Sequence, residues 1–121
     1  MAKHNDTGNK GEEIAVDYLK GNGYFIKERN WRFGKNEIDV IASDGKELAI
    51  VEVKTRSSRY LVEPFTAVTR TKQKLLIRAA NAYVKRVNYC GDVRFDVISI
   101  ILFPDSHELE HMKNAFYPLM R

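Results

Sequence analysis

Charged side chains interrupt two of the most apolar stretches of this sequence. Glu37 and Asp39 lie in the first stretch and Glu52 and Lys54 in the second, with a short polar segment between them. Burying an unpaired charge costs several kcal/mol, so strands this hydrophobic exclude Glu and Lys unless a partner or a metal ion compensates them. The sequence therefore predicts that these two strands carry the chemistry of the protein.

The two strands are expected to form a hairpin, because Asp44-Gly45 between them is a strong two-residue turn signal. A turn at these residues pairs Glu37 with Glu52. Side chains alternate along a strand, so this register places Glu37, Asp39, Glu52 and Lys54 on one face, with Asp39 and Glu52 as diagonal neighbours about 7–8 Å apart.

Clustered carboxylates of this kind suit a divalent cation. Without a cation, Asp39 and Glu52 would repel each other and one would stay protonated. One or two Mg²⁺ or Mn²⁺ ions, with metal–oxygen distances of about 2.1 Å, could bridge them. Such a site fits phosphodiester hydrolysis, in which the metal neutralises the phosphate and activates water while Lys54 orients that water.

A purely structural explanation is also open for each residue. Glu37 and Asp39 could lie on a solvated strand face, and Lys54 could extend to solvent from a strand end. Glu52 is flanked by valines and could form a buried ion pair with an arginine. The candidate partners are Arg29, Arg32 and Arg94.

Length and composition limit the kinds of protein this can be. A chain of 121 residues with 44% apolar content can close one core, so we expect a single domain over residues 1–121, with residues 1–6 as a disordered tail. The net charge of +4 favours an anionic partner such as nucleic acid. One cysteine, a polar N-terminus and the lack of a long apolar run predict a cytoplasmic protein that does not enter membranes.

The elements are expected in the order αβββαββ, forming an α/β sandwich with a mixed five-stranded sheet. The first helix opens near Asp6-Thr7 and ends at Lys20, and its periodicity turns Glu12 inward and Glu13 outward. Strands are expected at about 24–33, 36–42 and 47–55, with an irregularity near Asn30 in the first of them. A connection at Pro64 leads to a helix at 69–87. Two strands follow, one at 93–103 that is buried on both faces and one at 108–116 at an edge of the sheet.

The second helix is basic and has no acidic residue, so it is a candidate for phosphate contacts. Its candidate residues are Arg70, Lys72, Lys74 and Arg78, with Arg56, Arg59 and Tyr60 in a loop after Lys54. The alternative is a solvated amphipathic helix. Trp31 is expected in the core rather than stacked on a base. His111 could be a general base only if the last strand returns beside Glu52.

The pattern formed by Asp39 and Glu52-Val53-Lys54 resembles the D…(D/E)-x-K motif of the restriction-endonuclease-like superfamily, especially its archaeal-type Holliday junction resolvases. A Glu on the first helix, here Glu12, belongs to that pattern. More closely, the chain resembles the small bacterial YraN-like family from about Gly8 to Phe116. The matching motifs are Gly8-x-x-Gly11-Glu12, Gly23-Tyr24, Asn30-x-Arg32, Glu37-Ile38-Asp39, Val51-Glu52-Val53-Lys54-x-Arg56, Arg94-Phe95-Asp96-Val97 and Asn114-Ala115-Phe116.

The resemblance implies a three-layer sandwich and a metal-dependent endonuclease acting on branched or structured DNA. In it Asp39, Glu52 and the Val53 carbonyl would bind the metal, Lys54 would position water, and Glu12 would complete the metal site. Glu37 is an additional candidate ligand. Asn36 replaces the usual Gly before the Glu-Ile-Asp triplet, which changes a turn rather than a ligand.

Several alternatives remain open to this interpretation of the sequence. RNA could replace DNA as the substrate. Cutting a junction needs two active sites, so a resolvase role would require a homodimer. The chain could also be a non-catalytic nucleic-acid-binding module that keeps the nuclease scaffold and acts through a partner protein.

Overall fold

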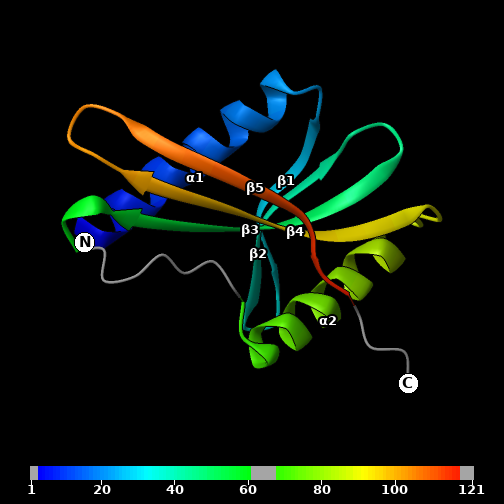
Figure 1. Ribbon diagram of the computed structural model, residues 1–121. Coiled ribbons are helices and arrows are strands. Elements are labelled where there is room, and N and C mark those ends of the chain that lie inside the picture. Colours follow the sequence, from blue (N-terminus) through cyan, green and yellow to red (C-terminus); the bar gives the residue numbers. More distant parts are fainter. Residues whose placement is uncertain (1–2, 61–67, 118–121) are drawn as a thin grey trace.

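The computed structural model describes residues 3–60 and 68–117 (Figure 1). The element order is αβββαββ, as predicted, with one short 3-10 turn added. The elements are α1 (Lys3–Gly21), β1 (Phe25–Phe33), β2 (Asn36–Ser43), β3 (Glu47–Ser57), the 3-10 turn η1 (Ser58–Tyr60), α2 (Arg70–Arg86), β4 (Asp92–Leu102) and β5 (His107–Phe116). Within these described residues, neither helix is long and apolar enough to cross a membrane.

The five strands form one mixed sheet in the order β1-β2-β3-β4-β5. Strands β3 and β4 run parallel, and all other neighbours are antiparallel. Parallel neighbours need a crossover connection, and α2 lies within it. Strand β5 lies at the edge beside β4, which confirms the predicted edge strand at 108–116.

The sheet is the middle of three layers, because each helix covers one of its faces (Figure 1). Ile41, Ile50 and Phe95 pack with α2, whereas Val51 and Ile98 pack with α1. Alternation along the strands separates the two cores. Strand β4 contributes to both cores, so the prediction that it is buried on both faces is confirmed.

Helix α1 begins at Lys3, earlier than the predicted start at Asp6-Thr7. The segment Lys3–Asp6 is therefore helical, in contrast to the disordered tail predicted for residues 1–6. The predicted helix end at Lys20 is correct to within one residue, because α1 ends at Gly21. Gly23 has a φ of +88°, and the chain then turns back so that the Tyr24 amide donates to the Leu19 carbonyl.

Helix α2 begins directly after Thr69, whose hydroxyl accepts a hydrogen bond from the Lys72 amide at 3.1 Å. This cap fixes the start of the helix. The predicted connection at Pro64 lies outside the described residues.

The predicted hairpin register is wrong by two residues. The observed pairs are Val40 with Val51 and Ser43 with Leu48. Asp44 caps the turn, because its side chain accepts hydrogen bonds from the backbone amides of Lys46 and Glu47 at 2.8 Å each. The two loop residues are therefore Gly45, with a φ of +95°, and Lys46. Extended one step beyond the Val40–Val51 pair, this register sets Asp39 directly opposite Glu52.

Strand β1 contains the predicted irregularity at Asn30, which has a φ of +51°. A second irregularity, between Ile26 and Glu28, shifts the pairing with β2 by one residue. The register on either side of Asn30 sets this residue beside Asp39. The distortion therefore lies in the strand next to the candidate site.

Candidate active site

The structure brings Asp39 of β2 and Glu52 of β3 together. The Oδ2 atom of Asp39 accepts the Val53 amide at 2.8 Å, which holds this carboxylate against β3. The Glu52 side chain is only 12% exposed. Two acidic groups thus face one another where the sheet gives them little water.

Their electrostatics reflect this crowding. Burial, together with the charge of Glu52, raises the pKa of Asp39 to about 7. Burial also raises the pKa of Glu52, against the lowering effects of Lys72, Lys54 and a hydrogen bond from Asp39. The pair therefore keeps one proton up to neutral pH, because two adjacent buried carboxylates cannot both ionise without a counter-charge.

One oxygen of this pair has no partner. Among the side chains that the structure describes, Glu52 Oε1 is the one buried polar atom without a hydrogen bond, while Oε2 lies 4.0 Å from the Lys72 Nζ atom. A buried oxygen without a hydrogen bond calls for an explanation, such as a catalytic role, a bound ion or a water molecule. A hard divalent cation between Asp39 and Glu52 would fit this donor set.

The fit is limited in the number of side-chain ligands. Among the described residues there is no group of three or more His, Cys, Asp or Glu side chains placed to hold a metal. Asp39 and Glu52 are two such ligands, so the remaining coordination would come from backbone, as expected for the Val53 carbonyl, from water or from substrate.

Glu12 faces the site from α1. Both of its oxygens accept hydrogen bonds from the Asn30 side-chain amide, at 3.1 and 3.2 Å. Partial burial and the charge of Asp39 raise the pKa of Glu12. Glu13 instead points outward and pairs with Arg29 at 3.1 Å, so the predicted contrast between Glu12 and Glu13 is correct.

A groove of about 810 Å³ runs beside Glu12 and Asp39, and Val53 and Arg59 also line it. The groove gives Glu12 and Asp39 access to solvent and to a ligand far larger than an ion. Arg59 places a positive charge on its wall, where a phosphate would be favoured.

The expectation that Glu37, Asp39, Glu52 and Lys54 share one face is wrong in part. Val51 and Val53 pack on the α1 side, so alternation turns Glu52 toward α2, where Lys72 contacts it. Glu12 lies on the α1 side. Asp39 lies where the alternation of β2 changes, because Ile38 packs toward α2 and Val40 toward α1. The site therefore spans both faces of the sheet.

The other candidate residues surround this pair. The charge of Lys54 lowers the pKa of Glu52, which places Lys54 within electrostatic reach of it. The charge of Glu37 raises the pKa values of both Asp39 and Glu12. Glu37 itself pairs with Arg32 at 4.0 Å.

Lys72 has a different position from the one expected for a phosphate contact, because it is the cation beside Glu52. The alternative of a buried pair between Glu52 and an arginine is wrong. Arg29 and Arg32 pair with Glu13 and Glu37, and Arg94 pairs with Asp44, Glu47 and Asp96. Sequence spacing could not show which residue of α2 reaches the sheet.

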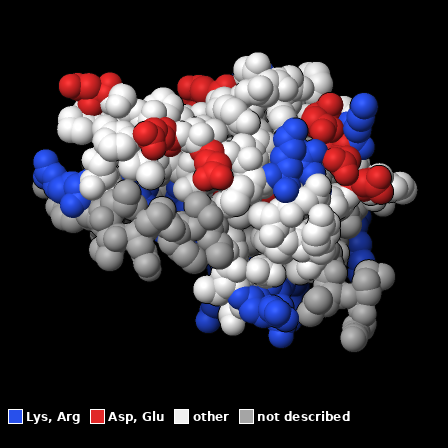
Figure 2. All heavy atoms as spheres, viewed as in Figure 1, with Lys and Arg blue, Asp and Glu red and all other residues white. Residues whose placement is uncertain are grey.

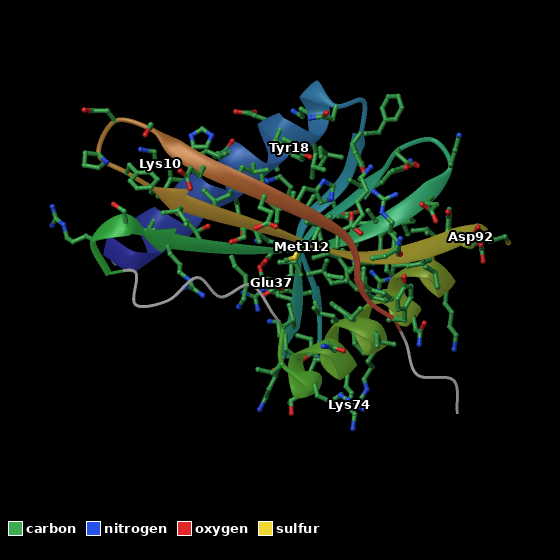
Figure 3. The ribbon with its side chains drawn as sticks, viewed as in Figure 1. Lys10, Tyr18, Glu37, Lys74, Asp92 and Met112 are labelled. Atoms are coloured by element: carbon green, nitrogen blue, oxygen red, sulfur yellow. The ribbon has the colours of Figure 1, made fainter. Side chains whose placement is uncertain are left out.

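The remaining basic candidates occupy two places. Arg56 lies in β3 and Arg59 in η1, so the predicted loop is a strand end and a 3-10 turn. Arg70, Lys74 and Arg78 lie on the outer side of α2, and Figure 3 shows Lys74 pointing away from the sheet. Trp31 packs edge-on against Tyr83 with 5.3 Å between ring centroids, which confirms its place in the core.

A buried polar network, which is not among the predicted sites, lies apart from the carboxylate pair. Asp96 is fully buried and bonds to Arg94 Nε at 3.0 Å, to His111 Nε2 at 2.8 Å and to the Asn114 amide at 3.1 Å. Tyr18 bonds to His111 Nδ1 at 3.0 Å.

This network explains two of the motifs in the sequence, the one around Arg94 and Asp96 and the one that contains Asn114. An arginine and an aspartate two residues apart within an apolar strand were the signal for it. It also places His111 on β5, paired with β4 rather than with β3. The condition for His111 to act as a base beside Glu52 is therefore not met.

The sequence is similar to a set of bacterial proteins. The Uncharacterised protein family UPF0102 matches residues 11–100. A UPF0102 protein of Bacteroides thetaiotaomicron is 47% identical over 118 residues and covers 98% of each chain. A UPF0102 protein of Porphyromonas gingivalis is 44% identical over 123 residues, which span 100% of this chain and 91% of that one.

A solved structure shares the fold. A Holliday junction resolvase from the archaeal hyperthermophile Archaeoglobus fulgidus aligns with a TM-score of 0.51 at 14% identity, covering 87% of this chain and 75% of the other. The mixed sheet between two helices, in the order αβββαββ, therefore has the restriction-endonuclease-like fold.

Proposed function

This chain belongs to the UPF0102 family, which is the YraN-like family, and we propose that it is a divalent-metal-dependent endonuclease that hydrolyses phosphodiester bonds in branched or structured DNA. The observation that carries the proposal is the orphaned, buried Oε1 atom of Glu52 beside Asp39. A carboxylate pair that must hold a proton at neutral pH is costly for folding, and a bound cation removes that cost.

Mg²⁺ or Mn²⁺, when bound, would neutralise phosphate charge and lower the pKa of an attacking water. The residues of the chain act around it. Asp39 and Glu52 would hold the cation with the Val53 carbonyl, while Asn30 holds Glu12, which lines one groove together with Asp39. Lys54 orients water or substrate at the carboxylates, and Arg59 binds phosphate on the groove wall.

The basic surfaces of the protein support DNA as the proposed substrate. Arg56 and Arg59 follow the D…(D/E)-x-K segment, and Arg70, Lys74 and Arg78 extend along α2, which has no acidic residue. Lys72, also on α2, lies beside Glu52 of the carboxylate pair. DNA fits this arrangement, and RNA is the competing substrate to be tested in the same assay.

The proposal is tested with calorimetric titration of Mn²⁺ and with cleavage of a four-way junction, a flap, a single strand and an RNA hairpin. Asp39→Ala and Glu52→Gln should abolish metal binding and cleavage and leave the circular dichroism spectrum unchanged. Glu13→Gln, an exposed carboxylate on the same helix as Glu12, is the control that should retain both activities. If the wild type binds no Mn²⁺ and cuts none of these substrates, the enzyme proposal fails.

A second candidate function is a nucleic-acid-binding module without catalysis. Two observations favour it. Lys72 already gives Glu52 a counter-charge, and among the described residues only two acidic side chains, rather than three, are placed to bind a metal ion. In that case Asp39→Ala would leave DNA affinity and cellular function unchanged, while Lys74→Gln would weaken binding and flatten its salt dependence.

Cleaving both strands of a junction requires two active sites, so the resolvase form of the proposal includes a homodimer. Light scattering of the protein with and without a four-way junction tests this part. A stable monomer that nonetheless cuts flaps or single strands would keep the nuclease proposal and exclude junction resolution.

A further inference from the structure

A second groove lies on the outer face of α2, separate from the carboxylate pair. Its volume is about 340 Å³. Arg70, Lys74 and Arg78 line it together with Ile77, and Tyr117 lines it from the segment that follows β5. The groove therefore joins the helix surface to the C-terminal end of the last strand.

The three cations form a row. Residues four apart on a helix lie on the same side and rise about 6 Å along its axis. The sequence of α2 contains no Asp or Glu that would offset their charge. In Figure 2, blue side chains gather at the lower edge of the molecule, where α2 lies in Figure 1. Such a row is complementary to the successive phosphates of a nucleic-acid strand.

Tyr117 adds a feature that a duplex backbone does not need. The residue is 68% exposed, although a large aromatic ring favours burial. An exposed ring beside a row of cations is the arrangement on which single-stranded nucleic acids stack their bases. A base inside a duplex has both faces covered by its neighbours, so it cannot offer a face to Tyr117.

We propose that this groove binds an unpaired nucleotide segment, with its phosphates on Arg70, Lys74 and Arg78 and one base stacked on Tyr117. The inference names the substrate class of the proposed nuclease, DNA with a single-stranded region, and rests on the proposed function for that assignment. The groove itself is independent of the carboxylates, because none of Asp39, Glu52 or Glu12 lines it.

Fluorescence anisotropy in EDTA tests the proposal without metal or cleavage. The probes are a short labelled single-stranded oligodeoxynucleotide and a blunt duplex of the same sequence. Tyr117→Ala should weaken binding of the single strand about tenfold and leave the duplex unchanged. Tyr117→Phe, which keeps the ring, should bind the single strand like the wild type. Lys74→Gln should lower the salt slope for the single strand by about 0.7.

Phe25→Ala is the matched control, because Phe25 is 69% exposed at the start of β1 and does not line this groove. Its variant should bind both probes like the wild type. Equal affinity of Tyr117→Ala and wild type for the single strand would overturn the proposal. So would an equal loss for the duplex, or a loss with Tyr117→Phe as large as with Tyr117→Ala.

The two proposals fail separately. An absence of Mn²⁺ binding and cleavage would refute the nuclease and leave the anisotropy result standing. Conversely, a Tyr117→Ala variant that still binds the single strand normally would refute the stacking groove even if the wild type cuts DNA.

Discussion

Asp39 and Glu52 conflict with each other as neighbours in a folded protein. Both are largely buried, both have raised pKa values, and the Oε1 atom of Glu52 lacks a hydrogen bond. Lys72 relieves part of this conflict from 4.0 Å away. Residues that oppose folding in this way are commonly retained for function, and their cost gives measurable consequences.

The first consequence is a pH dependence of stability in the metal-free protein. Asp39 binds its proton up to about pH 7 when folded, but only up to about pH 4 when unfolded. The folded state therefore holds more protons between these values, and stability falls as pH rises from about 4 to 7. Asp39→Asn should flatten this fall and raise the free energy of unfolding at pH 8 by about 1–2 kcal/mol.

Urea unfolding in EDTA at pH 5 and pH 8 measures this effect. Asp105→Asn, at an exposed position, is the control and should keep the pH dependence of the wild type. A wild-type protein that is equally stable at both pH values would contradict the raised pKa of Asp39.

Lys72 gives the second prediction. Its ammonium group occupies the neighbourhood that a metal ion would share, so removing its charge should favour the ion. We expect Lys72→Met to bind Mn²⁺ about fivefold more tightly, since the side chain is partly exposed and its charge is partly screened. Calorimetric titration measures the change. Lys74→Met, on the outer side of α2, should leave Mn²⁺ affinity unchanged, and a weaker affinity in Lys72→Met would show that Lys72 supports the metal site.

At the scale of elements, the site depends on how closely α1 packs on β3. Gly11 is buried, and a side chain there would overlap the side chain of Thr55. Glu12 is the next residue, so this contact sets how near its carboxylate comes to Asp39. A helix with any larger residue at this position would stand farther from the sheet.

Gly11→Ala should therefore destabilise the fold by about 1–3 kcal/mol through overpacking. Gly8→Ala is the matched control one turn earlier, where nothing lies within 4 Å of an added Cβ. It should be neutral or stabilise the helix by up to about 1 kcal/mol. Thermal unfolding of both variants checks the pair, and equal stability of the two would mean that α1 does not pack on Thr55.

The elements also show what the sequence could predict. Hydrophobic periodicity and turn residues were enough for the αβββαββ order, the edge strand and the irregularity at Asn30, because these depend on local signals. The hairpin register was wrong because Asp44 caps the turn instead of lying within the two-residue loop, which is Gly45-Lys46. Asp-Gly and Gly-X pairs both suit a two-residue turn, so turn composition alone does not choose between the two registers.

At the scale of the whole molecule, the sequence identified Asp39 and Glu52 as neighbours but not the partners that reach them. Lys72 arrives from a helix packed on the opposite face of the sheet from Glu12, and its position depends on the cap at Thr69. The buried network was likewise invisible as a unit, since its members lie on separate elements. Long-range side-chain geometry of this kind has no period in the sequence.

That network connects most of the molecule. Arg94 and Asp96 on β4 bond to one another and, through further contacts, reach the β2–β3 turn, Tyr24 after α1, and His111 on β5. Arg94 is only 4% exposed, and its acidic partners raise its pKa. The network thus stabilises the edge of the sheet and one end of α1 together.

Removing one member of a buried charge pair leaves the other without compensation, which costs about 3–5 kcal/mol. Asp96→Ala should lose about this amount, a large part of the stability of a small domain. Urea unfolding monitored by circular dichroism measures it, and Asp92→Asn, at the exposed start of β4, should remain within about 0.5 kcal/mol of the wild type.

Because an apolar replacement of a whole buried pair is often tolerated, Arg94→Met combined with Asp96→Leu should recover part of the loss. A double variant no more stable than Asp96→Ala would show that the hydrogen bonds to His111 and Asn114, rather than the uncompensated Arg94, carry the stability.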